Sequence, residues 1–203
     1  MLDRTTTPIR TRSDKPWLRT ARWVGSFIGF PLGGLAASVI VGPVNSGLTA
    51  IAGGLLTGAV LGAAQAVGLG LSGTAALRWI AATSVGLGTG LGIGATAVGF
   101  ATSVQDLLVQ GAISGLLVGI AQAVLLRKSL GSLALSWPPA VAAFWALGWF
   151  MTTSIGVQVD QQWTVFGAAG AITVTVLTAI LPTIIARKAL SAHATPASAR
   201  SAS

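Results

Sequence analysis

The stretch LLVQGAISGLLVGIAQAVLL, residues 107–126, decides how this chain folds. It holds 20 residues without a charged side chain, and Arg127 and Lys128 follow it directly. A helix of about 20 apolar residues, rising 1.5 Å per residue, crosses the roughly 30 Å hydrocarbon core of a bilayer. The length and apolar character of this stretch therefore predict a membrane-spanning helix.

Charge-free runs of this kind occupy most of the chain. The others cover residues 23–77, 79–105, 129–159 and 161–186. The first is long enough for two spans, and the helix-breaking sequence GPVNS at residues 42–46 divides it. Because none of these segments has the polar face of a soluble helix, we expect an all-α, polytopic transmembrane bundle. Its six spans are predicted at residues 23–41, 48–69, 79–100, 107–126, 138–156 and 164–186.

The composition supports a membrane protein and excludes several kinds of site. Only 8% of the residues are charged and 53% are hydrophobic, whereas soluble proteins carry about 25% charged residues. Cysteine is absent and His193 is the single histidine. Disulfides, thiolate-bound metals and bis-histidine haem are therefore excluded, and we expect no metal and no cofactor.

The distribution of charge predicts the orientation. With six spans, all basic residues fall on one side of the membrane, and Asp106 and Asp160 fall on the other. The positive-inside rule then places both termini in the cytoplasm, in a bacterial inner membrane. This segregation also argues against nucleic acid as the partner of the basic residues. The twelve are Arg4, Arg10, Arg12, Lys15, Arg19, Arg22, Arg78, Arg127, Lys128, Arg187, Lys188 and Arg200.

An internal repeat of about 57 residues organises the chain. Gly58-x3-Gly62-x2-Gln65 recurs as Gly115-x3-Gly119-x2-Gln122, and a weaker third copy runs through residues 167–180 and includes Thr178. Trp23, Trp79 and Trp137 open the odd-numbered spans at offsets of 56 and 58. We therefore expect three tandem helical hairpins of the same orientation, which is a parallel repeat. They cover about residues 23–69, 79–126 and 137–186, within a membrane domain at 23–188. A disordered basic tail is expected at 1–22 and a flexible Ala/Ser-rich tail at 189–203, both cytoplasmic.

Glycines at a spacing of four mark one face on each of the first four spans. We name each trio a glycine ladder and expect it to let helix backbones approach closely. Intramolecular packing is the favoured use of the ladders, and packing against a partner or a second copy is the alternative. The ladders are Gly25, Gly29 and Gly33; Gly54, Gly58 and Gly62; Gly86, Gly90 and Gly94; and Gly111, Gly115 and Gly119.

Few side chains inside the spans carry chemistry. Gln65, Gln122 and Thr178 are the intramembrane polar residues that we single out, and we expect the glutamines to bridge helices by hydrogen bonds. Contact with a polar ligand is the alternative for them. No nucleophile and base pair up at membrane depth, so we predict no catalytic residue and no enzyme. The tryptophans that open the odd-numbered spans are expected near the cytoplasmic interface, the depth that indole rings favour.

The Gly-x3-Gly-x2-Gln signature on alternate spans, followed by a short basic loop, resembles small, uncharacterised multi-pass bacterial membrane proteins. Members often have Gln-Trp where this chain has Gln65-Ala66 and Gln122-Ala123. The resemblance covers about residues 48–188. It implies a membrane location and no particular activity.

These features predict a non-enzymatic inner-membrane protein. We expect an accessory or assembly subunit of a larger membrane complex, or a self-associating scaffold that packs through its glycine ladders. Its partners are then the lipid bilayer, other membrane subunits or a second copy. One alternative is a small channel, exporter or facilitator for neutral or amphipathic solutes. A third hypothesis is a lipid- or pigment-binding membrane protein.

Overall fold

The computed structural model of this chain is a helical bundle, and it describes residues 16–160, 162–185 and 187. No strand occurs in these ranges. The residues predicted as the C-terminal tail, and residues 1–15 of the N-terminal tail, lie outside them. The elements are α1 (Pro16–Gly25), η1 (Ser26–Ile28), α2 (Gly29–Ile40), α3 (Gly47–Leu69), α4 (Gly73–Ala97), α5 (Val104–Leu130), η2 (Gly131–Ser136), α6 (Trp137–Ser154) and α7 (Ala168–Thr178).

Five helical segments are long and apolar enough to cross a membrane, so the chain has the character of an integral membrane protein. The fourth segment, Val104–Ser154, has 51 residues and contains both α5 and α6, which the short 3-10 helix η2 separates. The other four are Trp17–Ile40, Gly47–Leu69, Gly73–Ala97 and Ala168–Ile185.

Three predicted boundaries were wrong. Pro16 begins α1, so residues 16–22, expected to be part of a disordered tail, are helical; proline suits a first helical turn because its missing N–H has no role there. Helix α4 begins at Gly73 and not at residue 79. Residues 164–167 are not helical, and α7 begins at Ala168.

Local sequence signals explain how the α3–α4 hairpin begins and ends. The side chain of Ser46 accepts a hydrogen bond from the backbone of Thr49, whose hydroxyl accepts one from the backbone of Ser46. This capping box satisfies two N–H groups that the first turn of a helix leaves free. At the other end Gly70 has a φ of +69°, a conformation that glycine adopts without strain, and the chain turns directly into α4.

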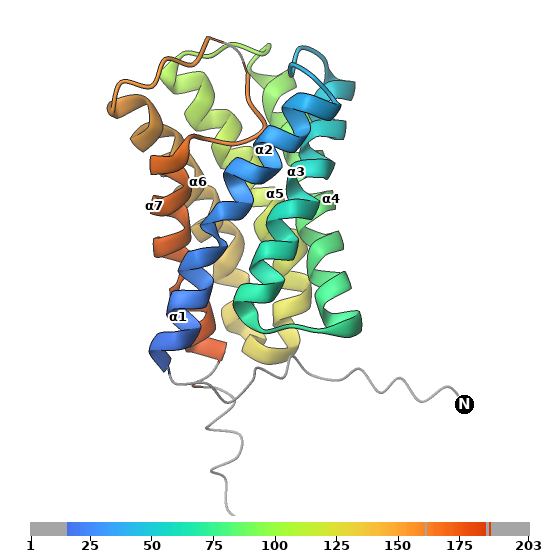
Figure 1. Cartoon of the computed structure of the whole chain (residues 1–203), viewed down its shortest axis with the longest axis vertical. Helices are drawn as coiled ribbons and strands as arrows, with labels where there is room; N and C mark the ends of the chain where they lie inside the picture. The colour runs from blue at the N-terminus through green and yellow to red at the C-terminus, as the bar shows by residue number, and fades with distance from the viewer. Residues whose placement is uncertain (1–15, 161, 186, 188–203) are drawn as a thin grey trace, which may run out of the picture.

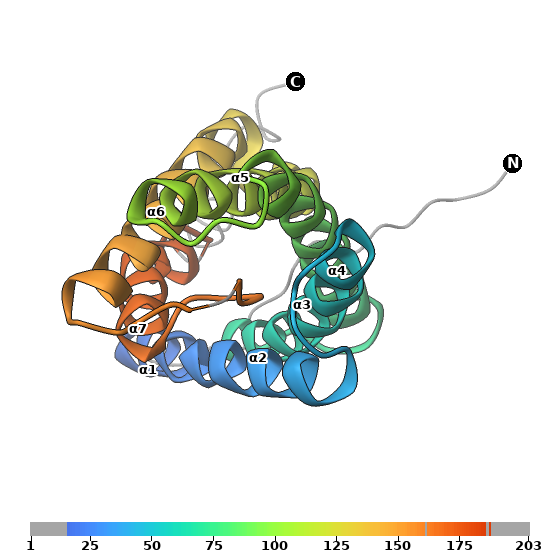
Figure 2. The same cartoon turned by 90° about the horizontal axis from the view of Figure 1, so that it is seen from above.

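The helices form a ring in the order of the chain (Figures 1 and 2). Helix α3 packs between α2 and α4, α5 packs between α4 and α6, and α7 follows α6. The ring is closed because α7 also contacts α1, η1 and α2. Seen from above in Figure 2, the segment that leads into α7 runs into the middle of the ring.

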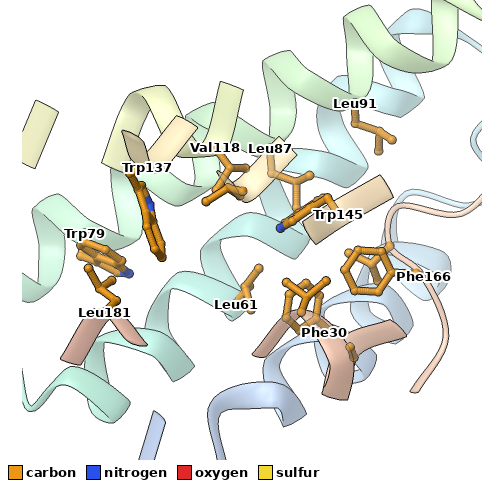
Figure 3. Close-up of a cluster of buried hydrophobic side chains, with 14 of the residues drawn as sticks. Phe30, Leu61, Trp79, Leu87, Leu91, Val118, Trp137, Trp145, Phe166 and Leu181 are labelled. Atoms are coloured by element: carbon orange, nitrogen blue, oxygen red, sulfur yellow. The ribbon is translucent and has the colours of Figure 1, made fainter. Parts of the chain in front are cut away.

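Large apolar side chains from around the ring fill its interior (Figure 3). Phe166 lies at the centre of an aromatic group, with ring centroids 5.0 Å from Phe30, 5.4 Å from Trp145 and 6.0 Å from Trp149. Most of these pairs meet edge to face, the arrangement that the ring quadrupoles favour. Many large apolar residues, Val39 and Leu48 among them, lie exposed on the outside of the ring, as expected where lipid is the solvent.

Candidate functional site

Glycines four residues apart line α3 where it packs against α4: Gly54, Gly58 and Gly62. A Cβ added at Gly58 would lie 2.7 Å from the Cα of Ser84 and from the carbonyl oxygen of Thr83. Real Cβ atoms do not approach other atoms so closely, so only glycine permits this contact between two helix backbones. The ladder therefore brings α3 and α4 together at their backbones.

A second ladder on α5 does the same against α6: Gly111, Gly115 and Gly119. A Cβ at Gly115 would lie 2.6 Å from the carbonyl oxygen of Val141 and 2.8 Å from the Cβ of Trp145. At Gly119 it would lie 2.6 Å from the Cα of Pro138. The interfaces α3–α4 and α5–α6 thus use the same device at equivalent positions of the repeat.

Helix α4 is packed on both sides, as the spacing of its glycines indicates. Its ladder faces α5, where a Cβ at Gly90 would lie 2.7 Å from the Cα of Ser114; Gly86 and Gly94 also face α5. Gly88 and Gly92 face Leu55 and Ile51 on α3 instead. On α2, Gly29 and Gly33 face α3 in the same way.

Gly25 is the exception among the twelve ladder glycines, and its assignment as a packing residue was wrong. It is exposed, and a Cβ added there would meet nothing within 4 Å. The helix tightens into η1 directly after Gly25, and a 3-10 helix turns 120° per residue. The spacing of four therefore does not keep Gly25 on the face of Gly29.

Three buried tryptophans donate hydrogen bonds across equivalent interfaces. The indole Nε1–H of Trp79 on α4 donates to Oε1 of Gln65 on α3, at 3.1 Å. That of Trp137, the first residue of α6, donates to Oε1 of Gln122 on α5, at 2.9 Å. In each pair a tryptophan within the first two turns of one helix bonds a glutamine in the second half of the preceding helix.

Trp23 completes the series between the two ends of the chain. Its Nε1–H lies 3.1 Å from both the hydroxyl oxygen of Thr178 and the carbonyl oxygen of Thr175 on α7. Thr178 occupies the place in α7 that Gln65 and Gln122 occupy in α3 and α5. All three tryptophans are buried in the bundle and do not face lipid. Their depth near the cytoplasmic interface stays a prediction.

Gln122 links the interfaces to one another. Its Nε2 donates to Oε1 of Gln65 and to Oγ1 of Thr83, both at 3.1 Å, while its own Oε1 accepts from Trp137. Each buried polar atom of this amide therefore has a partner. In a low-dielectric interior, such a satisfied network holds the surrounding helices in one arrangement.

The space at the centre of this polar group is nearly filled. A cavity of about 10 Å³, with Phe30 and Val118 on its walls, lies among Gln65, Gln122, Thr178, Trp23 and Trp137. A single water molecule needs about this much room. The polar group therefore encloses little more than the space of one water molecule.

The segment between α6 and α7 enters the ring instead of passing over it. The hydroxyl of Thr57 on α3 donates to Oγ1 of Thr164 at 2.9 Å, and Thr164 and Phe166 are buried. Phe166 meets Trp145, which lies nine residues, or about 13 Å of helix rise, before the end of α6. Residues 164–167 are thus non-helical backbone inside the helical ring; in a membrane protein such backbone is tolerated where protein surrounds it.

Two neighbouring hollows lie beside this segment, at the end of the bundle that carries residues 42–46. The larger, of about 420 Å³, lies between α2 and the residues that lead into α7. The smaller, of about 150 Å³, is bounded by the turn at residues 42–44. They share four lining residues, Gly34, Ser38, Trp163 and Thr164.

Acidic side chains and unpartnered polar atoms outside the Gln122 network are sparse in the described residues. No group of three or more His, Asp or Glu side chains that could hold a metal occurs there. Three buried polar atoms have no hydrogen-bond partner in the same ranges: Oε1 of Gln110, Oε1 of Gln162 and Oγ of Ser129. Gln110 and Ser129 lie near the two ends of α5, and Gln162 lies in the segment between α6 and α7. None of the hydrogen bonds of Gln122 reaches them.

Comparison with known proteins assigns no family: the chain matches no protein-family model, no curated protein and no solved structure. The argument for function therefore rests on the contacts described above. Sequence analysis singled out Gln65, Gln122 and Thr178 but missed their tryptophan partners, although the recurrence of Trp23, Trp79 and Trp137 beside them was a usable signal.

Proposed function

We propose that this chain crosses a bacterial cytoplasmic membrane six times, as three tandem hairpins with both termini in the cytoplasm. In this arrangement α5 and α6 are separate spans, joined at the cytoplasmic side by η2. One support is that a tryptophan contact recurs at the corresponding position of each repeat. The other is that Arg78, Arg127 and Lys128 all lie in the connections assigned to the cytoplasmic side.

Within this membrane, we propose a non-enzymatic role as an accessory or assembly subunit of a larger complex. The observation that carries this proposal is the satisfied network around Gln122, which uses the interior amides for packing and leaves about 10 Å³ at the axis. A solute pathway needs polar groups that face a passage, and these face one another. The resemblance to small multi-pass bacterial membrane proteins is part of the same proposal.

The scaffold hypothesis needs one correction. Eleven of the twelve ladder glycines do not serve self-association, because atoms of the same chain already pack against them. A partner subunit would therefore meet the outward apolar side chains, such as Leu48 and Val124, which are 78% and 65% exposed.

Cysteine labelling tests the topology, since the chain has no cysteine of its own. A membrane-impermeant maleimide added to intact cells should label Asn45→Cys and Asp160→Cys. It should label Ser72→Cys and Ser132→Cys only after the membrane is permeabilised. Labelling of Ser132→Cys in intact cells would show that α5 and α6 do not form a hairpin, and would overturn the six-span topology.

Native mass spectrometry after mild detergent extraction tests the role. We expect the chain to leave the membrane with other subunits in a defined ratio. A lone chain that mediates solute flux in liposomes would contradict the proposal and support the channel, exporter or facilitator instead.

A further inference from the structure

The larger hollow is an apolar cleft on the lateral surface of the bundle. Leu35 on α2 forms one wall and is 61% exposed, and Val165 and Phe166 form the floor. With a volume of about 420 Å³, the cleft falls within the usual range of small-molecule sites. Because the exposed Leu35 borders it, the cleft is open to the outside of the bundle, where lipid chains are the solvent of a membrane protein.

The cleft exists because the ring is packed more loosely where α7 meets α1 and α2 than at the glycine-ladder interfaces. No glycine ladder joins α2 to α7, and the two helices touch at few points. The segment before α7 separates them, with a side-chain methyl of Val165 placed 3.1 Å from where a Cβ of Gly34 would lie. Water gains little in such an apolar space, whereas an acyl chain from the neighbouring leaflet can fill it.

The smaller hollow gives the cleft a polar end. It continues from the cleft through Ser38 and Thr164. The hydroxyl of Ser38 donates to the carbonyl oxygen of Leu35 and can still accept, and that of Thr164 accepts from Thr57 and can still donate. It reaches the turn at residues 42–44, which the charge distribution places at the outer surface of the membrane. The polar end therefore points outward and the apolar cleft inward, the orientation of a lipid in the outer leaflet.

No charged side chain lines either hollow among the described residues. A charged head group would be buried there without a partner of opposite charge, which is costly. Hydroxyl groups would instead find hydroxyl and backbone partners. The lining thus favours an uncharged head group.

We propose that this site binds a neutral, hydroxyl-bearing glycerolipid from the outer leaflet. The acyl chain lies in the cleft between α2 and the segment before α7, and the glycerol hydroxyls occupy the smaller hollow. This inference needs only the membrane location and the outward position of residues 42–46. It stands whether or not the chain is an accessory subunit.

Photolabelling in phosphatidylcholine nanodiscs tests the site. The probe is monooleoylglycerol with a diazirine in its acyl chain, and labelled peptides are identified by mass spectrometry. We expect label at residues 31–35 and 163–168. Unlabelled monooleoylglycerol should compete at least tenfold better than the anionic lyso-phosphatidylglycerol with the same chain. Equal competition would overturn the uncharged head group, and label spread evenly over all lipid-facing helices would overturn the site.

Matched variants separate the cleft from the general lipid surface. Leu35→Trp fills the cleft from an exposed position and should lower the labelling at least fivefold. Val39→Trp, one helical turn further and 76% exposed but outside the lining, should leave it unchanged. Ala168→Leu adds bulk at the opposite wall of the cleft and should likewise lower the labelling at least fivefold. Equal labelling of all three variants would contradict the proposal.

Discussion

Three interfaces of the ring carry a tryptophan hydrogen bond: α3–α4 and α5–α6 are tight, and the one where α7 meets α1 and α2 is loose. The tight ones combine a glycine ladder with a tryptophan–glutamine hydrogen bond. At the loose one, threonine replaces glutamine, Ala171 stands where the repeat would place a glycine, and the non-helical segment enters beside it. Where the glycines and the glutamine of the motif are present, the two helices pack closely. Where alanine and threonine replace them, a cleft remains.

The largest expected effect is at a ladder glycine of a tight interface. Gly115→Ala places a Cβ 2.6 Å from the carbonyl oxygen of Val141, so the two helices must move apart. We expect the free energy of unfolding to fall by about 3 kcal/mol, the upper part of the range for overpacking. Unfolding in mixed micelles with increasing dodecyl sulfate, followed by circular dichroism, measures this change.

Gly25→Ala is the control for that substitution, since its Cβ meets nothing within 4 Å. It should change the free energy of unfolding by less than about 0.5 kcal/mol. Equal losses in both variants would show that the ladders do not determine the packing.

Removal of the linking amide should have the next largest effect. Gln122→Leu leaves the indole N–H of Trp137 without its acceptor and removes both bonds from Nε2. An unsatisfied buried donor costs about 1–3 kcal/mol, so we expect a loss of about 2 kcal/mol in the same assay. A loss below the level of experimental error would mean that the Gln122 network does not hold the interfaces together.

The equivalent change at the loose interface should be the smallest. Thr178→Val removes one acceptor, but the N–H of Trp23 keeps the carbonyl oxygen of Thr175 at 3.1 Å. We expect a loss of about 0.6 kcal/mol, the mean for hydrogen bonds between membrane helices. A loss as large as that of Gln122→Leu would remove the distinction between tight and loose interfaces.

The helices could be predicted from the sequence because the bilayer imposes a simple rule on length and charge. Residues 48–69 were expected as a span, and α3 covers Gly47–Leu69. The non-helical conformation of residues 164–167 could not be predicted, because an apolar segment has the same composition whether it is a helix in lipid or coil inside protein. The tertiary contacts of Phe166 hold this segment inside the ring, and hydropathy carries no information about such contacts.

The candidate site could be predicted in part. The spacing of the repeat identified Gln65 and Gln122 as bridging residues, since a buried amide needs partners. Their partners were missed because a tryptophan at the start of a span fits both an interfacial anchor and a buried donor, and only the packing of neighbouring helices distinguishes the two. The cleft was not foreseen, since it arises from the position of Thr164 and Val165 against α2.

Hydrogen exchange of the indole N–H groups tests the closed ring most directly. The protein is labelled with ¹⁵N-tryptophan, assigned by Trp→Phe variants and transferred into D₂O in detergent micelles. We expect the indole protons of Trp23, Trp79 and Trp137 to persist far longer than that of Trp17, which is 64% exposed. If Trp23 exchanges as fast as Trp17 while the other two stay protected, the first and third hairpins do not meet and the ring is open.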